Sequence, residues 1–226
     1  MNELQQQITK LGACEDAVAW CAGKTLSVAW HDCDRADWMF WLLVQMAGED
    51  GWPSAQQICL AGIACGRLSL DYAGDLVGTL SYVFDIAETC VQNPTPENIS
   101  AVWSARNVAR IVAQDSAAVG NCAQSAVAWS AENSAHSAAQ SVKSVDSSAA
   151  SRTAAHIVAW SAAQSIAWSA ESAAWRAVRS ADSVAHSAAW SAAWRAAWRA
   201  AECAALLKMA DIVRRLLTIP ASLHGF

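Results

Sequence analysis

The stretch from about residue 101 to 205 is written almost entirely in Ala, Ser and Trp, and no other feature limits the fold as strongly. Alanine is the best helix former, and serine is tolerated in helices. Between residues 97 and 219 the chain has one Gly, Gly120, and no Pro. The phrase Ala-Trp-Ser-Ala recurs there, so tiny side chains alternate with the largest one available. Since no part of the chain alternates polar and apolar residues with period two, we predict an all-α fold.

The N-terminal part, residues 1–92, has instead the composition of an ordinary globular protein, with Gly and Pro between helical segments. One predicted helix carries Trp38 and Trp41 and ends near Gly48. Pro53 is suited to the first position of another helix. The spacing predicts these further helices over residues 13–22, 25–31, 54–68 and 76–91.

Residues 93–96, Asn-Pro-Thr-Pro, form the clearest boundary, because Thr95 can cap a helix and Pro96 suits its first turn. We therefore predict an N-terminal helical subdomain that continues into an Ala/Ser/Trp-rich antiparallel helical bundle and ends in a short tail. The predicted bounds are residues 1–92, 96–217 and 218–226.

Serines in the bundle segment keep a heptad-like register, which predicts seams where small side chains let helices approach closely. The register comprises Ser130, Ser134, Ser137, Ser141, Ser144, Ser148 and Ser151. One helix over residues 122–217 would exceed about 140 Å, so we expect three or four helices. Residues that compete with the backbone for hydrogen bonds mark the expected breaks, near Asn121, Asn133, residues 146–148 and residues 182–183.

Net charge, hydropathy and cysteine spacing argue against a nucleic-acid-binding, membrane-spanning or secreted disulfide-linked protein. A net charge of −5 and a pI near 5.5 argue against a nucleic-acid partner. The longest apolar run, Trp38–Val44, is too short to span a membrane, and residues 1–10 do not resemble a secretory signal. Eight cysteines occur without a Cys-x-x-Cys pair. We expect reduced, mostly buried thiols in a cytoplasmic protein without a membrane partner.

Motifs for catalysis are not found, so we expect no enzyme, no cofactor and no bound metal. The chain lacks His-Glu-x-x-His, Gly-x-Gly-x-x-Gly and Gly-x-Ser-x-Gly patterns. The polar run over residues 31–37 fits helix capping and an Arg35–Asp37 surface pair better than a metal site. His136, His156 and His186 have Ser or Ala neighbours and are expected on exposed faces.

Arginines that adjoin tryptophans offer a binding chemistry, because a base or adenine ring stacks on Trp while Arg meets phosphate. The alternative is that the tryptophans form the core and the arginines extend to solvent. The candidate ligand-binding residues of this kind are Trp175, Arg176, Trp194, Arg195, Trp198 and Arg199.

Residues 12–44 resemble the N-terminal signature of the immunity protein family of bacteria and phages. The resemblance lies in Gly12–Trp20, in Ala29-Trp30 and above all in Cys33–Leu43, with Asp-Trp-Met at its centre. The Ala/Ser/Trp segment is similar to that of many members, whereas Phe40 stands where Leu is expected. The resemblance implies neutralisation of an antagonist by binding, in a bacterial or phage-infected cytoplasm. It adds four candidate ligand-binding residues, Arg35, Asp37, Trp38 and Trp41.

These observations predict a non-catalytic sequestering protein, for which two partners of different classes remain open. One is a small nucleotide-derived immune signal, favoured by the Trp–Arg adjacency and by the scarcity of acidic clusters. The other is a protein toxin that the chain occludes. A weaker alternative is an architectural helical protein without a ligand. Small-residue seams and rows of tryptophan also predict a homo-oligomer.

Overall fold

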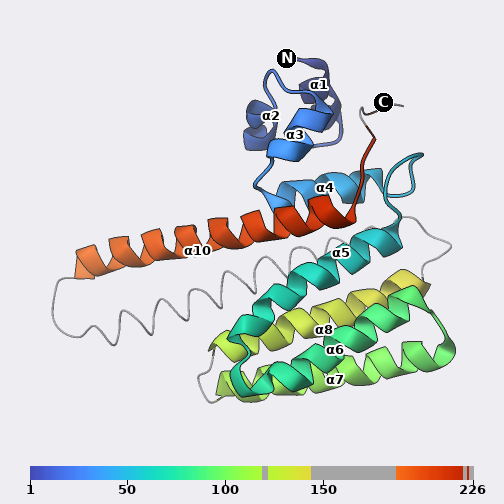
Figure 1. Ribbon diagram of the computed structural model, residues 1–226. Coiled ribbons are helices and arrows are strands. Elements are labelled where there is room, and N and C mark those ends of the chain that lie inside the picture. The colour runs from blue at the N-terminus through green and yellow to red at the C-terminus, as the bar shows by residue number, and fades with distance from the viewer. Residues whose placement is uncertain (119–121, 144–186, 221–222, 224–226) are drawn as a thin grey trace.

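The structure is a computed structural model that describes residues 1–118, 122–143, 187–220 and 223. All regular elements in these ranges are helical, which confirms the predicted all-α class (Figure 1). No described helix is both long and apolar enough to cross a membrane. The elements are α1 (Glu3–Lys10), α2 (Glu15–Trp20), α3 (Leu26–Asp32), α4 (Ala36–Met46), α5 (Ala55–Arg67), the 3-10 turns η1 (Leu68–Tyr72) and η2 (Gly74–Leu76), α6 (Val77–Gln92), α7 (Pro96–Ala118), α8 (Cys122–Lys143) and α10 (Ser187–Leu216).

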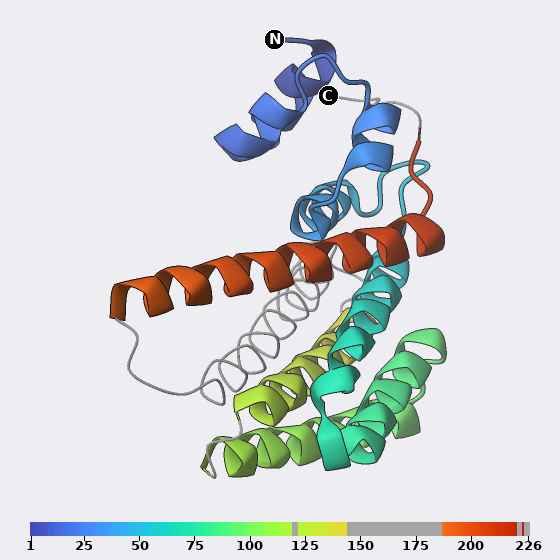
Figure 2. The ribbon, with the colours of Figure 1, turned by 60° about the vertical axis from the view of Figure 1, so that its left-hand side comes forward.

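Two hydrophobic clusters hold the described helices together. The first cluster joins α1–α5 to the C-terminal half of α10, and the second joins α5 to α6, α7 and α8. Helix α5 contributes to both, because Ile58 and Cys65 lie in the first cluster and Ile63 in the second. Figure 2 shows α10 crossing the end of α5 on the side opposite to α6 and α7. The two clusters are therefore stacked along α5.

The predicted boundary at residues 93–96 separates α6 from α7. Thr95 caps α7 as expected, because the Asn98 backbone N–H donates to Thr95 Oγ1 at 3.2 Å. Each hydrophobic cluster, however, draws on helices from both sides of this boundary. The division of the chain into the three predicted parts stays a prediction.

Several helix starts follow from local chemistry. Thr25 Oγ1 accepts from the Val28 N–H at 3.3 Å, so Thr25, the first residue of the helix predicted over residues 25–31, caps α3. Helix α5 begins one residue later than expected, because Ser54 and Gln57 exchange side-chain and backbone hydrogen bonds in a capping box. Pro53 thus precedes the cap and does not open the helix.

Helix α1 was not predicted, because residues 1–10 contain few apolar side chains. Asn2 and Gln5 form a capping box at its start. Leu4 and Ile8, one helical turn apart, are buried in the first cluster. Two apolar residues at that spacing are too weak a pattern to predict a helix from the sequence alone.

Helix α8 confirms part of the predicted small-residue seam. Ser130, Ser134 and Ser137 are fully buried, and a Cβ atom on Gly66 of α5 would lie 3.4 Å from Ser130 Oγ. The break expected at Asn133 is wrong, since α8 runs through it. Packing of α8 on α6 and α7 outweighs the local preference of Asn. The breaks expected at Asn121, residues 146–148 and residues 182–183 lie outside the described residues.

Candidate functional site

A cleft opens among α1, α2, α3 and α4, and its volume is about 60 Å³. One water needs about 10–15 Å³ by this measure, and a cavity of about 150 Å³ binds benzene, so the cleft itself admits only part of an aromatic ring. We call it the tryptophan cleft, because four half-buried tryptophans line it. Its lining is Leu4, Ile8, Ala17, Trp20, Cys21, Leu26, Ala29, Trp30, Cys33, Trp38, Met39, Trp41 and Leu42.

Two cations lie over tryptophan rings that line this cleft. Lys24 Nζ is 3.3 Å from the centroid of the Trp20 ring, and Arg35 Cζ is 4.5 Å from that of Trp38. The two rings meet edge to face, with centroids 6.0 Å apart and planes at 63°. Positive charge over an aromatic face is attracted by the ring quadrupole. The arrangement therefore combines aromatic surface with positive charge.

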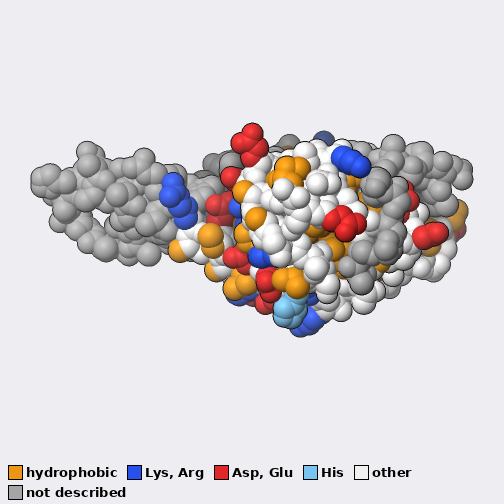
Figure 3. Space-filling model, turned by 90° about the horizontal axis from the view of Figure 1, so that it is seen from above, with side chains coloured by type: hydrophobic (Ala, Val, Ile, Leu, Met, Phe, Trp, Pro, Cys, Tyr) orange, Lys and Arg blue, Asp and Glu red, His pale blue; other side chains and the backbone are white. Residues whose placement is uncertain are grey.

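A carboxylate orients the arginine. Arg35 Nε and Nη2 donate to the two oxygens of Asp37 at 2.9 and 2.6 Å, which confirms the predicted surface pair. This hydrogen bonding raises the pKa of Arg35. A guanidinium has five N–H donors, so three remain for a ligand once Asp37 has taken two. Figure 3 shows acidic and basic side chains interspersed on the face above the α1–α3 end of the molecule.

Two cysteine thiols are part of the cleft lining. Cys21 and Cys33 are buried free thiols, and burial raises the pKa of both, that of Cys33 to about 11. Cys33 Sγ donates to the Arg35 carbonyl oxygen at 3.5 Å. At neutral pH both therefore stay protonated and behave as small apolar groups. Within the described ranges, no three His, Cys, Asp or Glu side chains gather as a metal site would require.

The structure brings together only the candidates of the N-terminal motif. Arg35, Asp37, Trp38 and Trp41 share α4 and its first turn, and both tryptophans line the cleft. Arg199 is exposed on α10. Trp194, Arg195 and Trp198 belong to α10, but their side chains lie outside the described part of the chain, as do Trp175 and Arg176 entirely.

No protein-family model, curated protein or solved structure matches this chain. The resemblance to the immunity protein family therefore stays a prediction, carried by residues 12–44 and the Ala/Ser/Trp segment. Trp20 and Trp30 also belong to that motif, and the sequence did not single them out as ligand-binding residues. The sequence could have indicated both as site residues, because they lie in the same motif as Trp38.

A polar network between α7 and α8 was missed altogether. Arg106 Nε donates to Glu132 Oε1 at 2.8 Å, and Arg106 Cζ lies 5.3 Å from the Trp103 ring. His136 meets that ring edge to face at 5.6 Å and shares a 3.0 Å hydrogen bond with Gln140. His136 was expected on an exposed face but is half-buried, because Trp103 of α7 packs against its ring. The contacting residues of α7 and α8 lie about 30 positions apart, so no local sequence pattern predicts these contacts.

A second hollow lies between η1 and α10, with a volume of about 100 Å³. Alanines of α10 form one wall, and Tyr72 is the aromatic side chain that faces it. Asp71 and Lys208 bring opposite charges to its edge. It offers a ligand less aromatic surface than the tryptophan cleft, which is the stronger candidate site.

Proposed function

We propose that this protein sequesters a small nucleotide-derived signal in the tryptophan cleft, without chemical turnover. One observation carries the proposal: Lys24 and Arg35 lie on the faces of tryptophans that line a small apolar cleft. A ligand with one aromatic ring and an anionic tail matches both parts. The phage or bacterial setting follows from the family resemblance alone.

Binding would divide the ligand between cleft and rim. A stacked base contributes about 1–3 kcal/mol, and phosphate at the rim gains charge-assisted hydrogen bonds from the N–H groups of Arg35 that Asp37 leaves unused. Asp37 holds the guanidinium in place before the ligand arrives, which reduces the entropy lost on binding. The thiols of Cys21 and Cys33, protonated at neutral pH, are poor nucleophiles. Binding without turnover is consistent with such a lining.

A protein toxin is the second candidate, and the apolar lining favours it. A single aromatic side chain of a partner would fill the cleft without leaving buried hydrogen-bonding groups unpaired. Trp and Arg are the residues that most often dominate protein interfaces. Val28 on α3, 46% exposed and next to Ala29 of the cleft, would extend such a contact.

A panel of cyclic dinucleotides and ADP-ribose-type nucleotides tests the first candidate. A ligand should quench Trp fluorescence and raise the melting temperature by mass action. Arg35→Ala should weaken its binding about tenfold or more, the effect of a lost charge-assisted hydrogen bond, and leave helicity unchanged. Arg110→Ala, at an exposed position of α7, is the matched control.

Two outcomes redirect the proposal. If no nucleotide of the panel quenches fluorescence or stabilises the protein, the nucleotide candidate is wrong and the toxin candidate replaces it. If Arg199→Ala weakens binding while Arg35→Ala does not, the arginines of α10 form the site, as their sequence pattern predicts.

We also propose that the chain forms a homo-oligomer, because Val108, Ile111 and Trp129 expose 43%, 54% and 39% of their surfaces on α7 and α8. Light scattering at micromolar concentration should give a mass above that of one chain. A monomer whose Trp fluorescence is unchanged on dilution would contradict this.

A further inference from the structure

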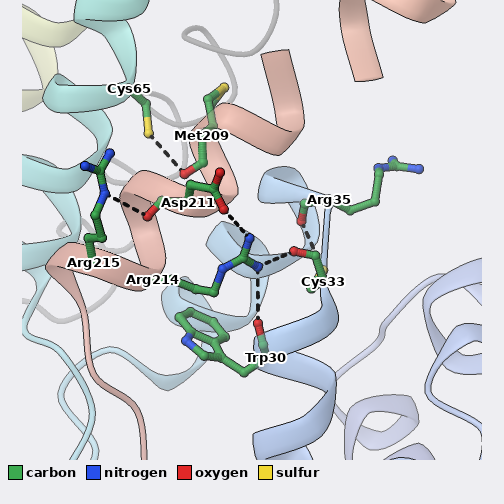
Figure 4. Close-up of polar contacts among 8 residues, drawn as sticks. All are labelled: Trp30, Cys33, Arg35, Cys65, Met209, Asp211, Arg214 and Arg215. Atoms are coloured by element: carbon green, nitrogen blue, oxygen red, sulfur yellow. Dashed lines mark hydrogen bonds and ion pairs between the residues drawn. The ribbon is translucent and has the colours of Figure 1, made fainter. Parts of the chain in front are cut away.

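Arg214, in the last turn of α10, reaches across to the end of α3 (Figure 4). Its Nη1 donates to the carbonyl oxygen of Cys33 at 2.5 Å and to that of Trp30 at 3.5 Å. Its Nη2 donates to Asp211 Oδ1 at 2.6 Å, so the carboxylate orients the guanidinium from its own helix. The Arg214 side chain is 20% exposed. This contact joins residues about 180 positions apart in the sequence.

The end of α3 needs such a partner. The last four carbonyl groups of a helix receive no hydrogen bond from an N–H group of the same helix. A positive charge at this end also complements the helix dipole. Helix α3 ends at Asp32, and Cys33 leads away from it in extended conformation. Arg214 therefore fixes both the last turn of α3 and the direction in which the chain continues toward α4.

We propose that Arg214 is a positioning residue for the tryptophan cleft. Trp30 and Cys33, whose carbonyl groups it binds, both line the cleft. Its guanidinium does not line the cleft, so it acts on a ligand only through these two residues. The part of this inference that concerns affinity rests on the proposed function, whereas the part that concerns the cleft itself does not.

A second residue of α10, Glu202, acts on Arg35 through its charge. After the Asp37 hydrogen bond, the charges of Asp37 and Glu202 raise the pKa of Arg35. Glu202 precedes Arg214 by a dozen residues, about 18 Å along a helix. The effect of Glu202 on Arg35 is electrostatic, whereas Arg214 binds residues of the cleft lining through hydrogen bonds.

Alkylation of single thiols, followed by peptide mass spectrometry without any ligand, tests this role. Cys33 and Cys21 lie in the cleft, whereas Cys90 is buried in the second cluster and reports global unfolding. Arg214→Ala should raise the alkylation rate of Cys33 about ten- to a hundredfold, the factor that a hydrogen bond to a charged group contributes to an opening equilibrium. The rate at Cys90 should not change.

Two further variants make the result decisive. Arg215→Ala is the matched control, because Arg215 Nε donates within its own helix, to the Asp211 carbonyl oxygen at 3.4 Å. Arg214→Lys keeps the charge but lacks the planar fork, and should give a Cys33 rate between those of wild type and Arg214→Ala. If Arg214→Ala unfolds the protein and exposes Cys90 as well, the alkylation rate of Cys33 in Arg214→Lys tests the positioning role instead.

The proposal is overturned if Cys33 reacts at the same rate in Arg214→Lys as in wild type, or no faster in Arg214→Ala than in Arg215→Ala. ADP-ribose provides the second arm: Arg214→Ala should weaken its binding by a similar factor at unchanged stoichiometry. If ADP-ribose does not bind wild type but Cys33 responds as predicted, the nucleotide proposal fails while the positioning role stands.

Discussion

The two hydrophobic clusters use side chains of very different size, and the tryptophan cleft lies beside the large aromatic rings of the first. The first buries Phe40, Leu43 and Met46, with four half-buried tryptophans around them. In the second, α7 and α8 contribute mostly Ala and Val, and their backbones approach closely. Rigid, planar rings cannot interdigitate as completely as methyl groups do. The tryptophan cleft thus lies among large, rigid rings in the part of the chain with ordinary composition, whereas small side chains of α10 line the second hollow.

Leucine substitution at two buried alanines should show the difference most strongly. Ala109 is fully buried in the second cluster, so Ala109→Leu should lower the free energy of unfolding by about 3 kcal/mol through overpacking. Ala29 lines the tryptophan cleft, so Ala29→Leu should change it by less than about 1 kcal/mol. Urea denaturation measures both. Equal losses at the two positions would mean that the cleft is no more open than the second cluster.

Glycine substitution should give a smaller effect of the same kind. A Cβ atom on Gly66 would lie 2.9 Å from Phe84 Cε1, so Gly66→Ala should lower stability by about 1–2 kcal/mol. Gly78 on α6 has nothing within 4 Å of such a Cβ, and Gly78→Ala should stabilise the helix by about 0.5–1 kcal/mol. Thermal unfolding of the pair checks the signs. A neutral Gly66→Ala would show that α5, α6 and α8 can move apart freely.

The smallest expected effect is a pH dependence confined to the second cluster. Burial and the charge of Arg106 lower the pKa of His136, while Glu132 opposes them. An unfolded histidine titrates near about 6.5, so the unfolded state binds more protons below that pH. The contribution of neutral His136 to the free energy of unfolding is therefore fully present above about pH 6.5. It is lost as the pH drops through the lowered pKa of folded His136.

His136→Gln should remove that component of the pH dependence, whereas His31→Gln, at an exposed position of α3, should not. Urea midpoints measured from pH 7.5 down to about 5 provide the comparison. An unchanged slope in His136→Gln would show that other groups produce the acid sensitivity.

Local features were predictable, and contacts between distant segments were not. The caps at Thr25 and Thr95 follow from residues three apart, and the Arg35–Asp37 pair from residues two apart. The all-α class follows from composition and periodicity, both of which extend over many residues. Trp38 and Trp41 of the N-terminal motif could be named as site residues because they lie within one short, recognisable stretch, whereas Trp20 and Trp30 of the same motif were missed.

The assembly of the cleft needed tertiary information. Leu4 and Ile8 of an unpredicted helix form one wall, and Arg214 fixes α3 from the far end of the chain. The break expected at Asn133 failed for the same reason, since packing along α8 outweighs a local preference. Sequence spacing says which residues share a helix face, but not which helix that face meets.

Ligand retention is the most direct test of nucleotide binding in the tryptophan cleft. Purified protein is incubated with the nucleotide panel and separated from free ligand, and the molecule released by heat is identified by mass spectrometry. We predict that wild type and Arg110→Ala each retain one nucleotide of the panel and release it intact. Ala29→Leu, which fills the tryptophan cleft, should retain none. Equal retention by wild type and Ala29→Leu, or no retention by wild type, would contradict the account.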